Sequence, residues 1–160
     1  MDLHMKGKAA VVAGGSTGIG FATALCFLEE GCKVAVFARN AEKLETAREQ
    51  FASLGYKDVM TGSADATLEE AVNKFAADVV ERFGTIDYWV NVAGGSLRKS
   101  LNKVTNEEFD KVVAINLKSA FFGCNAAARY MKKNEKGGAI VNVSSMAAHR
   151  AAAGRALYGC

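Results

Sequence analysis

The sequence predicts an α/β fold in which a doubly wound parallel sheet lies between two layers of helices. Short runs rich in Val, Ile and Ala alternate with longer segments of helical period, which is the pattern of stacked βαβ units. The short runs are apolar on both faces, as expected where helices cover a sheet on both sides. Five strands are expected, at residues 9–13, 33–37, 59–64, 88–92 and 139–143.

The segments between these strands are expected to be helices, at residues 19–30, 41–54, 68–83 and 107–133. Gly31, Gly55 and Gly84 lie where helices commonly end with a left-handed residue. The Ala-rich stretch 147–156 is expected to be a loop. A chain of 160 residues, half of them apolar, has enough material for one buried core, so residues 1–160 are predicted to form a single domain.

Composition argues against several classes of partner. The net charge of +3 is spread over alternating basic and acidic residues, and without a basic stripe interleaved with aromatics we expect no nucleic acid partner. The first apolar run, 9–13, is too short for a signal-peptide core or a membrane span, so no membrane contact is expected. The cysteines show neither a disulfide framework nor metal-ligand spacing, which favours a reducing cytoplasm and no metal site; they are Cys26, Cys32, Cys124 and Cys160.

A glycine-rich turn follows the first strand and precedes an apolar helix. It reads Ala13-Gly14-Gly15-Ser16-Thr17-Gly18-Ile19-Gly20. Glycines in such a turn allow a tight bend, a close approach to a pyrophosphate and close packing of helix on strand, while the helix N-terminus attracts the anion. This predicts a Rossmann-type dinucleotide site. Its predicted contacts in the turn are Gly14, Ser16, Thr17, Gly18, Ile19 and Gly20. In a purely structural alternative, the Ser16 and Thr17 hydroxyls only cap the helix.

The same turn also fits the nucleophile elbow of α/β-hydrolases, since it reads Gly14-x-Ser16-x-Gly18. That site needs an oxyanion-hole loop from an earlier strand, followed by an acid and a histidine. No strand precedes this turn, and His149 is the only histidine downstream of it. The hydrolase is therefore the weaker of the two interpretations.

The end of the second strand predicts which cofactor is preferred. Dinucleotide folds that use NAD place a carboxylate there against the ribose 2′-hydroxyl, whereas this sequence reads Phe37-Ala38-Arg39-Asn40. A guanidinium binds a 2′-phosphate through charge-assisted hydrogen bonds, and a carboxylate would repel it. We therefore expect NADP(H) to be preferred over NAD(H), with Arg39 and Asn40 in the site. The alternative for Arg39 is a solvated surface arginine.

Further motifs follow in a fixed order along the chain. They are Asp65-Ala66 after the third strand, Asn91-Val92-Ala93-Gly94 at the fourth, Asn116 within Val113-Ala114-Ile115-Asn116-Leu117, Asn142-Val143-Ser144-Ser145 at the fifth, and Tyr158 thirteen residues after Ser145. With the glycine turn, this series resembles the short-chain dehydrogenase/reductase family over essentially every segment present. Two positions depart from the family pattern: Ala13 stands for a threonine, and Val92 stands for an asparagine.

The resemblance implies a nucleotide site and an oxidoreductase reaction. By resemblance, Asp65 and Ala66 hold the adenine, and Asn91, Ala93 and Gly94 belong to the cofactor site. Hydride passes between nicotinamide and a carbonyl or secondary alcohol. Ser145 hydrogen-bonds the substrate oxygen, Tyr158 is the proton donor, and Asn116 helps order a linked water. A small, fairly apolar substrate is expected, in a pocket with walls from Gly95, Ser96, Leu97, Met146 and Ala147.

The family also places a lysine four positions after its tyrosine. A free tyrosine titrates at about pH 10, so a nearby cation is needed for proton transfer at neutral pH. The sequence given stops at Cys160, before that position. It is therefore expected to be the N-terminal part of a homo-oligomeric reductase, a dimer or tetramer, with a sheet that continues beyond five strands and little activity by itself. The alternative is a nucleotide-binding module without turnover, which the retained Ser145 and Tyr158 disfavour.

Overall fold

A computed structural model of the chain describes residues 2–150 and 152–159. Five strands form one parallel sheet in the order β3-β2-β1-β4-β5. The predicted doubly wound α/β fold is confirmed, and every strand lies within a residue or so of its expected bounds. The strands are β1 (Ala9–Ala13), β2 (Lys33–Ala38), β3 (Met60–Ser63), β4 (Tyr88–Asn91) and β5 (Ala139–Asn142).

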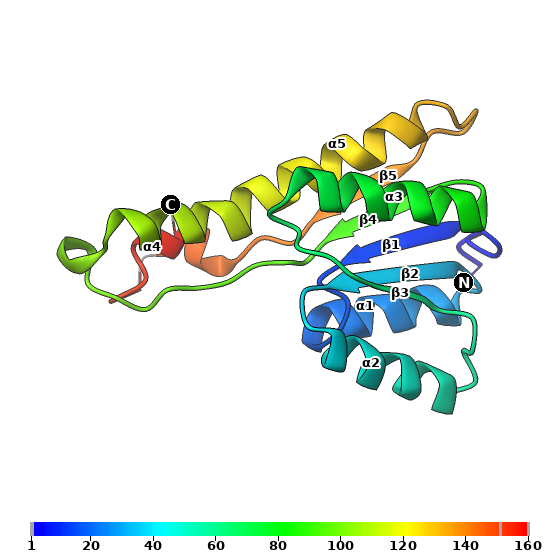
Figure 1. Cartoon of the computed structure of the whole chain (residues 1–160), viewed down its shortest axis with the longest axis horizontal. Coiled ribbons are helices and arrows are strands. Elements are labelled where there is room, and N and C mark those ends of the chain that lie inside the picture. The colour runs from blue at the N-terminus through cyan, green and yellow to red at the C-terminus, as the bar shows by residue number, and fades with distance from the viewer. Residues whose placement is uncertain (1, 151, 160) are drawn as a thin grey trace.

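Helices cover both faces of the sheet (Figure 1). On one face lie α1 (Gly18–Glu29) and α2 (Ala41–Ser53), and on the other lie α3 (Glu69–Phe83) and α5 (Ser119–Met131). The central strand β1 is buried along its whole length. Its alternate residues face opposite layers, since Ala10 and Val12 join the cluster beneath α1 and α2 while Val11 joins the one beneath α3 and α5. This two-sided burial explains the apolar runs of the sequence.

The helix expected over 107–133 is interrupted by a turn of π-helix. It consists of α4 (Asn106–Val113), the π turn Ala114–Lys118 and then α5, and together they extend beyond the end of the sheet (Figure 1). The expected helix is therefore present, with a π turn inside it that the sequence did not predict. A π turn inside an α-helix often marks a functional position, and Asn116 lies within this one.

The predicted helix ends are confirmed at three glycines, since Gly31, Gly55 and Gly84 have φ angles of 78°, 98° and 84°. The expectation of two buried faces fails at β5, which lies at the edge of the sheet and leaves Val141 53% exposed. The expected loop 147–156 begins in a short 3₁₀ turn (Met146–Ala148), and its other described residues lie outside helices and strands. Ala151 of that loop, and Cys160 and Met1 at the ends, lie outside the described residues.

Candidate nucleotide and active site

The glycine turn between β1 and α1 has no room for side chains at three positions. A Cβ added at Gly15 would lie 2.7 Å from the Cβ of Val36. A Cβ added at Gly20 would lie 2.1 Å from the carbonyl oxygen of Gly14, and one added at Gly14 would lie 2.8 Å from the amide nitrogen of Ala93. Gly18 differs, because its φ of 55° favours glycine while no atom lies within 4 Å of an added Cβ. The turn is therefore tightly packed at Gly14 and Gly20 and open to solvent at Gly18. This arrangement lets a pyrophosphate pass close to the backbone.

The N-terminus of α1 carries no side-chain cap. Thr17 is the N-cap residue, yet its side chain makes no capping hydrogen bond, and the first turn of α1 contains no acidic residue. The capping role considered for Thr17 is therefore not observed. Helix N–H groups left without a capping partner, together with the helix dipole, favour an anion at this end.

A cleft of about 510 Å³ opens above this turn. Its volume is in the range of small-molecule and cofactor sites. It brings together most of the residues predicted for the cofactor, namely Gly14, Ser16, Thr17, Gly18, Ile19, Gly20, Arg39, Asn40, Ala66, Ala93 and Gly94.

Two cations line one end of this cleft. Arg39 follows β2, and Lys43 follows in the first turn of α2. Neither head group takes part in the ion pairs found among residues 2–150 and 152–159. Unpaired cations at a concave site suit a phosphate group. Lys43 was not among the residues predicted for the site, although its place four residues after Arg39 was a usable signal.

A second cleft, of about 590 Å³, collects the predicted catalytic residues. Asn116, Ser145 and Tyr158 all line it. Of the expected substrate walls, Gly95 and Ser96 contribute, whereas Leu97, Met146 and Ala147 are absent from the described lining and Ala148 is present. A substrate contact for those three residues stays a prediction, and the turn after β5 presents Ala148 to this cleft.

The two clefts adjoin. Ile19, Val92, Ala93 and Gly94 line both of them, and Ile19 is 65% exposed although it is a large apolar residue. A ligand extending along the first cleft would therefore reach the second across this shared wall.

Asn116 joins the π turn to the loop after β4. Its side chain accepts from the Gly95 N–H at 3.1 Å and donates to the carbonyls of Gly95 and Val112 at 2.8 Å and 2.9 Å. Ser145 begins the turn after β5, where its hydroxyl accepts from the Ala147 N–H at 3.2 Å. Tyr158 lies half-buried in the 3₁₀ turn Leu157–Gly159.

Asn91 is buried and all of its side-chain bonds lie within the protein. It accepts from Trp89 Nε1 at 2.8 Å, and donates to Asn142 Oδ1 at 2.8 Å and to the Ala120 carbonyl at 3.3 Å. A Cβ at Gly123 would lie 2.1 Å from its Oδ1, so the glycine in α5 makes room for this network. The structural role of Asn91 is therefore to join β4, β5 and α5, while a cofactor contact for it stays a prediction.

Two other predicted residues also have partners within the chain. Asp65 Oδ1 accepts from both the N–H and the hydroxyl of Thr67 at 2.8 Å, and the flanking residues Ala64 and Ala66 line the cleft. Asn40 Oδ1 accepts from the Lys43 N–H at 2.8 Å and so caps α2. Their cofactor contacts also stay predictions.

Comparison with known proteins decides the family. A family model described as short chain dehydrogenase matches residues 8–160. The chain belongs to the short-chain dehydrogenase family. This membership overturns the hydrolase interpretation of the glycine turn.

Relatives of this short-chain dehydrogenase include the NADP-dependent (R)-specific alcohol dehydrogenase of Lentilactobacillus kefiri, 38% identical over 91% of this chain and 57% of that protein. Among solved structures, a short chain dehydrogenase from Mycobacterium smegmatis is 35% identical with a TM-score of 0.92, over 97% of this chain and 65% of the other. NAD⁺-bound xylitol dehydrogenase is also 35% identical, with a TM-score of 0.90, over 97% of this chain and 59% of the other. The chain thus spans less than two thirds of the length of each.

Within residues 2–150 and 152–159, no three His, Cys, Asp or Glu side chains gather as metal ligands would. In the same part of the chain, every helix is too short or too polar to cross a bilayer.

Proposed function

We propose that this chain forms the nucleotide-binding part and much of the active site of an NADP(H)-dependent oxidoreductase acting on a carbonyl or secondary alcohol. The observation that carries the proposal is the shared wall between the two clefts. A dinucleotide held over the glycine turn would extend past Ile19 and Gly94 toward Ser145 and Tyr158, which line the second cleft.

Three residues of the chain have separate roles in the proposed reaction. The bound dinucleotide supplies hydride transfer. The hydroxyl of Ser145 hydrogen-bonds the substrate oxygen, and the Tyr158 hydroxyl donates a proton to that oxygen during reduction or accepts one during alcohol oxidation. Asn116 keeps the Gly95 loop against the π turn, so that this wall of the cleft stays fixed.

The preference for NADP(H) rests on charge at the cleft end of β2. Ala38 brings no carboxylate there, while Arg39 and Lys43 offer two cations without ion-pair partners in the described chain. One relative is named as NADP-dependent and one structural neighbour holds NAD⁺, so likeness alone does not choose between them. The two cations at the end of the cleft support NADP(H).

Fluorescence titration with NADPH and NADH tests this preference directly. Arg39→Ala should weaken NADPH binding by about tenfold or more while leaving NADH binding nearly unchanged, because charge-assisted bonds to a phosphate are lost. Ala38→Asp should reverse the preference, and Lys136→Ala, which removes an exposed charge elsewhere, should change neither affinity. Equal affinities for both cofactors in the unaltered chain would overturn the assignment.

Turnover is tested on the polypeptide with its native continuation, against a panel of ketones, aldehydes and secondary alcohols. Tyr158→Phe should lower the rate by about a hundredfold or more, the usual contribution of general acid catalysis, and leave NADPH affinity unchanged. Undiminished activity in that variant would remove Tyr158 from its role.

We also propose that the whole protein is a cytoplasmic homo-oligomer. Phe109, Leu117 and Phe121 are largely exposed along α4, the π turn and α5, and exposed apolar groups of this size commonly mark association surfaces. The thiols of Cys26, Cys32 and Cys124 are free, in keeping with a reducing compartment. Sedimentation of Phe121→Glu should show a smaller species than the unaltered protein.

A further inference from the structure

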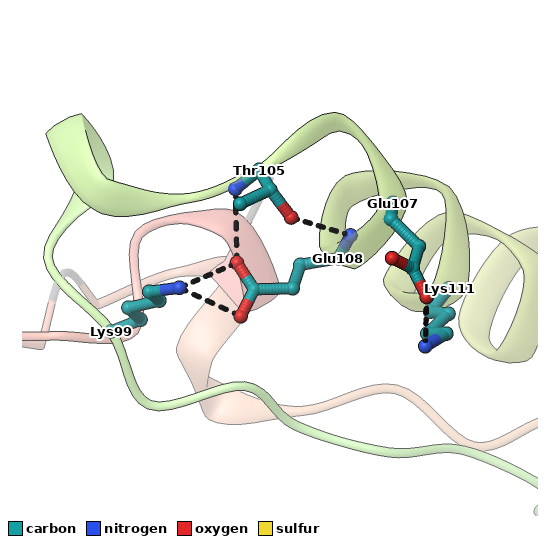
Figure 2. Close-up of polar contacts among 5 residues, drawn as sticks. All are labelled: Lys99, Thr105, Glu107, Glu108 and Lys111. Carbon is teal, nitrogen blue, oxygen red and sulfur yellow. Dashed lines mark hydrogen bonds and ion pairs between the residues drawn. The ribbon is translucent and has the colours of Figure 1, made fainter.

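Glu108 of α4 links two segments of the loop that precedes this helix. Its carboxylate accepts from Lys99 Nζ at 2.7 Å and 2.8 Å and from the Thr105 N–H at 2.9 Å (Figure 2). Thr105 returns a bond, because its hydroxyl accepts from the Glu108 N–H at 3.3 Å. Thr105 and Glu108 therefore form a capping box, and Lys99 is an additional partner that no capping box requires.

Lys99 connects this carboxylate to the segment that carries Tyr158. Its backbone N–H donates to the Gly154 carbonyl at 2.7 Å. A Cβ at Gly154 would lie 3.5 Å from Arg98 Cγ, so residues 98–99 pack closely against it. Leu157, next to Tyr158, is buried. A contact made nearly sixty residues earlier thus holds the backbone four residues before Tyr158.

The Lys99–Glu108 pair is the least exposed ion pair within the described ranges. Its side chains are 32% and 29% exposed, whereas Lys111 and Glu107, paired on the same helix, are 72% and 77% exposed. Exposed pairs contribute little because water screens them and two long side chains must be ordered. The shielded pair is the one able to fix a backbone, and the exposed pair is its natural control.

We propose that Lys99 and Glu108 are positioning residues for Tyr158. Their ion pair fixes the backbone of Lys99, whose N–H in turn holds Gly154 and keeps Tyr158 at the second cleft. Neither side chain lines either described cleft, so the pair acts on placement and leaves nucleotide contacts unchanged. The catalytic consequence rests on the function proposed above, whereas the positioning itself does not.

The positioning is tested by amide hydrogen exchange, which needs no turnover. In Glu108→Gln and Lys99→Met, the Lys99 amide and the amides of 152–159 should exchange about tenfold faster, while those of β1 stay unchanged. Glu107→Gln removes the exposed pair and should have no effect there. Lys99→Arg keeps the charge and should restore protection. Unchanged exchange in Glu108→Gln would overturn the proposal.

The catalytic consequence is tested on the polypeptide with its native continuation. Glu108→Gln and Lys99→Met should lower kcat by about tenfold or more, as small misplacements of a reacting group do, with NADPH affinity unchanged. Lys99→Arg should recover most of the rate. Faster exchange with kcat equal to that of Glu107→Gln would overturn the catalytic claim. Absence of turnover in the unaltered protein would instead refute the proposed function and leave the exchange result standing.

Discussion

The side-chain amide of Asn116 bonds both backbone groups of Gly95, accepting from its N–H at 3.1 Å and donating to its carbonyl at 2.8 Å. Asn116→Asp keeps the acceptor but turns a carboxylate toward the carbonyls of Gly95 and Val112. We expect a loss of about 1–3 kcal/mol in the free energy of unfolding, measured in urea, because these acceptors lose their donor. Asn106→Asp, at the exposed start of α4, should be nearly neutral. Equal stability of the two variants would contradict this account.

Gly18 and Gly20 should separate ligand binding from folding. Gly18→Ala adds a methyl group in open space at a left-handed φ, so it should cost only about 1–2 kcal/mol but weaken NADPH binding. Gly20→Ala places its methyl group against the Gly14 carbonyl and should cost about 2–3 kcal/mol or more. Thermal unfolding and cofactor titration of both variants check this. A stable Gly20→Ala protein would show that the turn can open.

The Glu108 carboxylate should make stability depend on pH. Hydrogen bonds from Lys99 and from the Thr105 backbone lower the pKa of Glu108. A lowered folded-state pKa stabilises the protein above the unfolded glutamate value of about 4.3, and this contribution is lost as the pH falls through the folded value. The stability gap to Glu108→Gln, measured in urea, should therefore be constant from about pH 6 to 8 and shrink below about pH 4.5. A gap that persists in acid would refute this ionic contribution.

The edge strand β5 should make the 160-residue chain self-associate. Its exposed Val141 lies on a strand with β4 as its one partner in the described sheet. Val141→Lys should shift sedimentation toward monomer, because a charge on an edge strand opposes pairing between chains. Leu54→Lys also places a lysine at an exposed apolar residue, beyond the end of α2, and should leave sedimentation unchanged. A sharp monomer at all concentrations in the unaltered chain would refute the prediction.

Most of the fold could be predicted because alternation of apolar runs and helical segments is a local signal. Strand β1 is apolar at every position because it is buried on both faces, and Gly84 ends α3 because the left-handed φ is accessible to glycine. The π turn at Asn116 had no such signal. Asn116 within it bonds Gly95, a residue twenty-one positions away in another segment, and no local pattern in the sequence indicates that contact.

The sequence predicted which residues gather at the site, but not the contacts that they make within the chain. Motif order brought Ser145 and Tyr158 to one cleft, as expected. The cofactor contacts of Asn40 and Asn91 stay predictions, and within the chain their side-chain amides cap α2 and join β4 to β5. An amide can serve either purpose, and its choice depends on neighbours that the sequence does not place. The ion pair between Lys99 and Glu108 was not predicted either, because the sequence does not place these two side chains next to each other.

The close contact between Gly14 and Gly20 divides the positions of the nucleotide site into those that tolerate substitution and those that do not. A side chain at position 20 would collide with backbone, whereas Arg39 and Lys43 are exposed and can be exchanged without touching the core. Substitutions at the rim of the first cleft are therefore open to drift or to engineering at small cost in stability. Those at Gly14 and Gly20 are not, so an evolving lineage can vary its recognition of the ligand's outer end while keeping these two glycines.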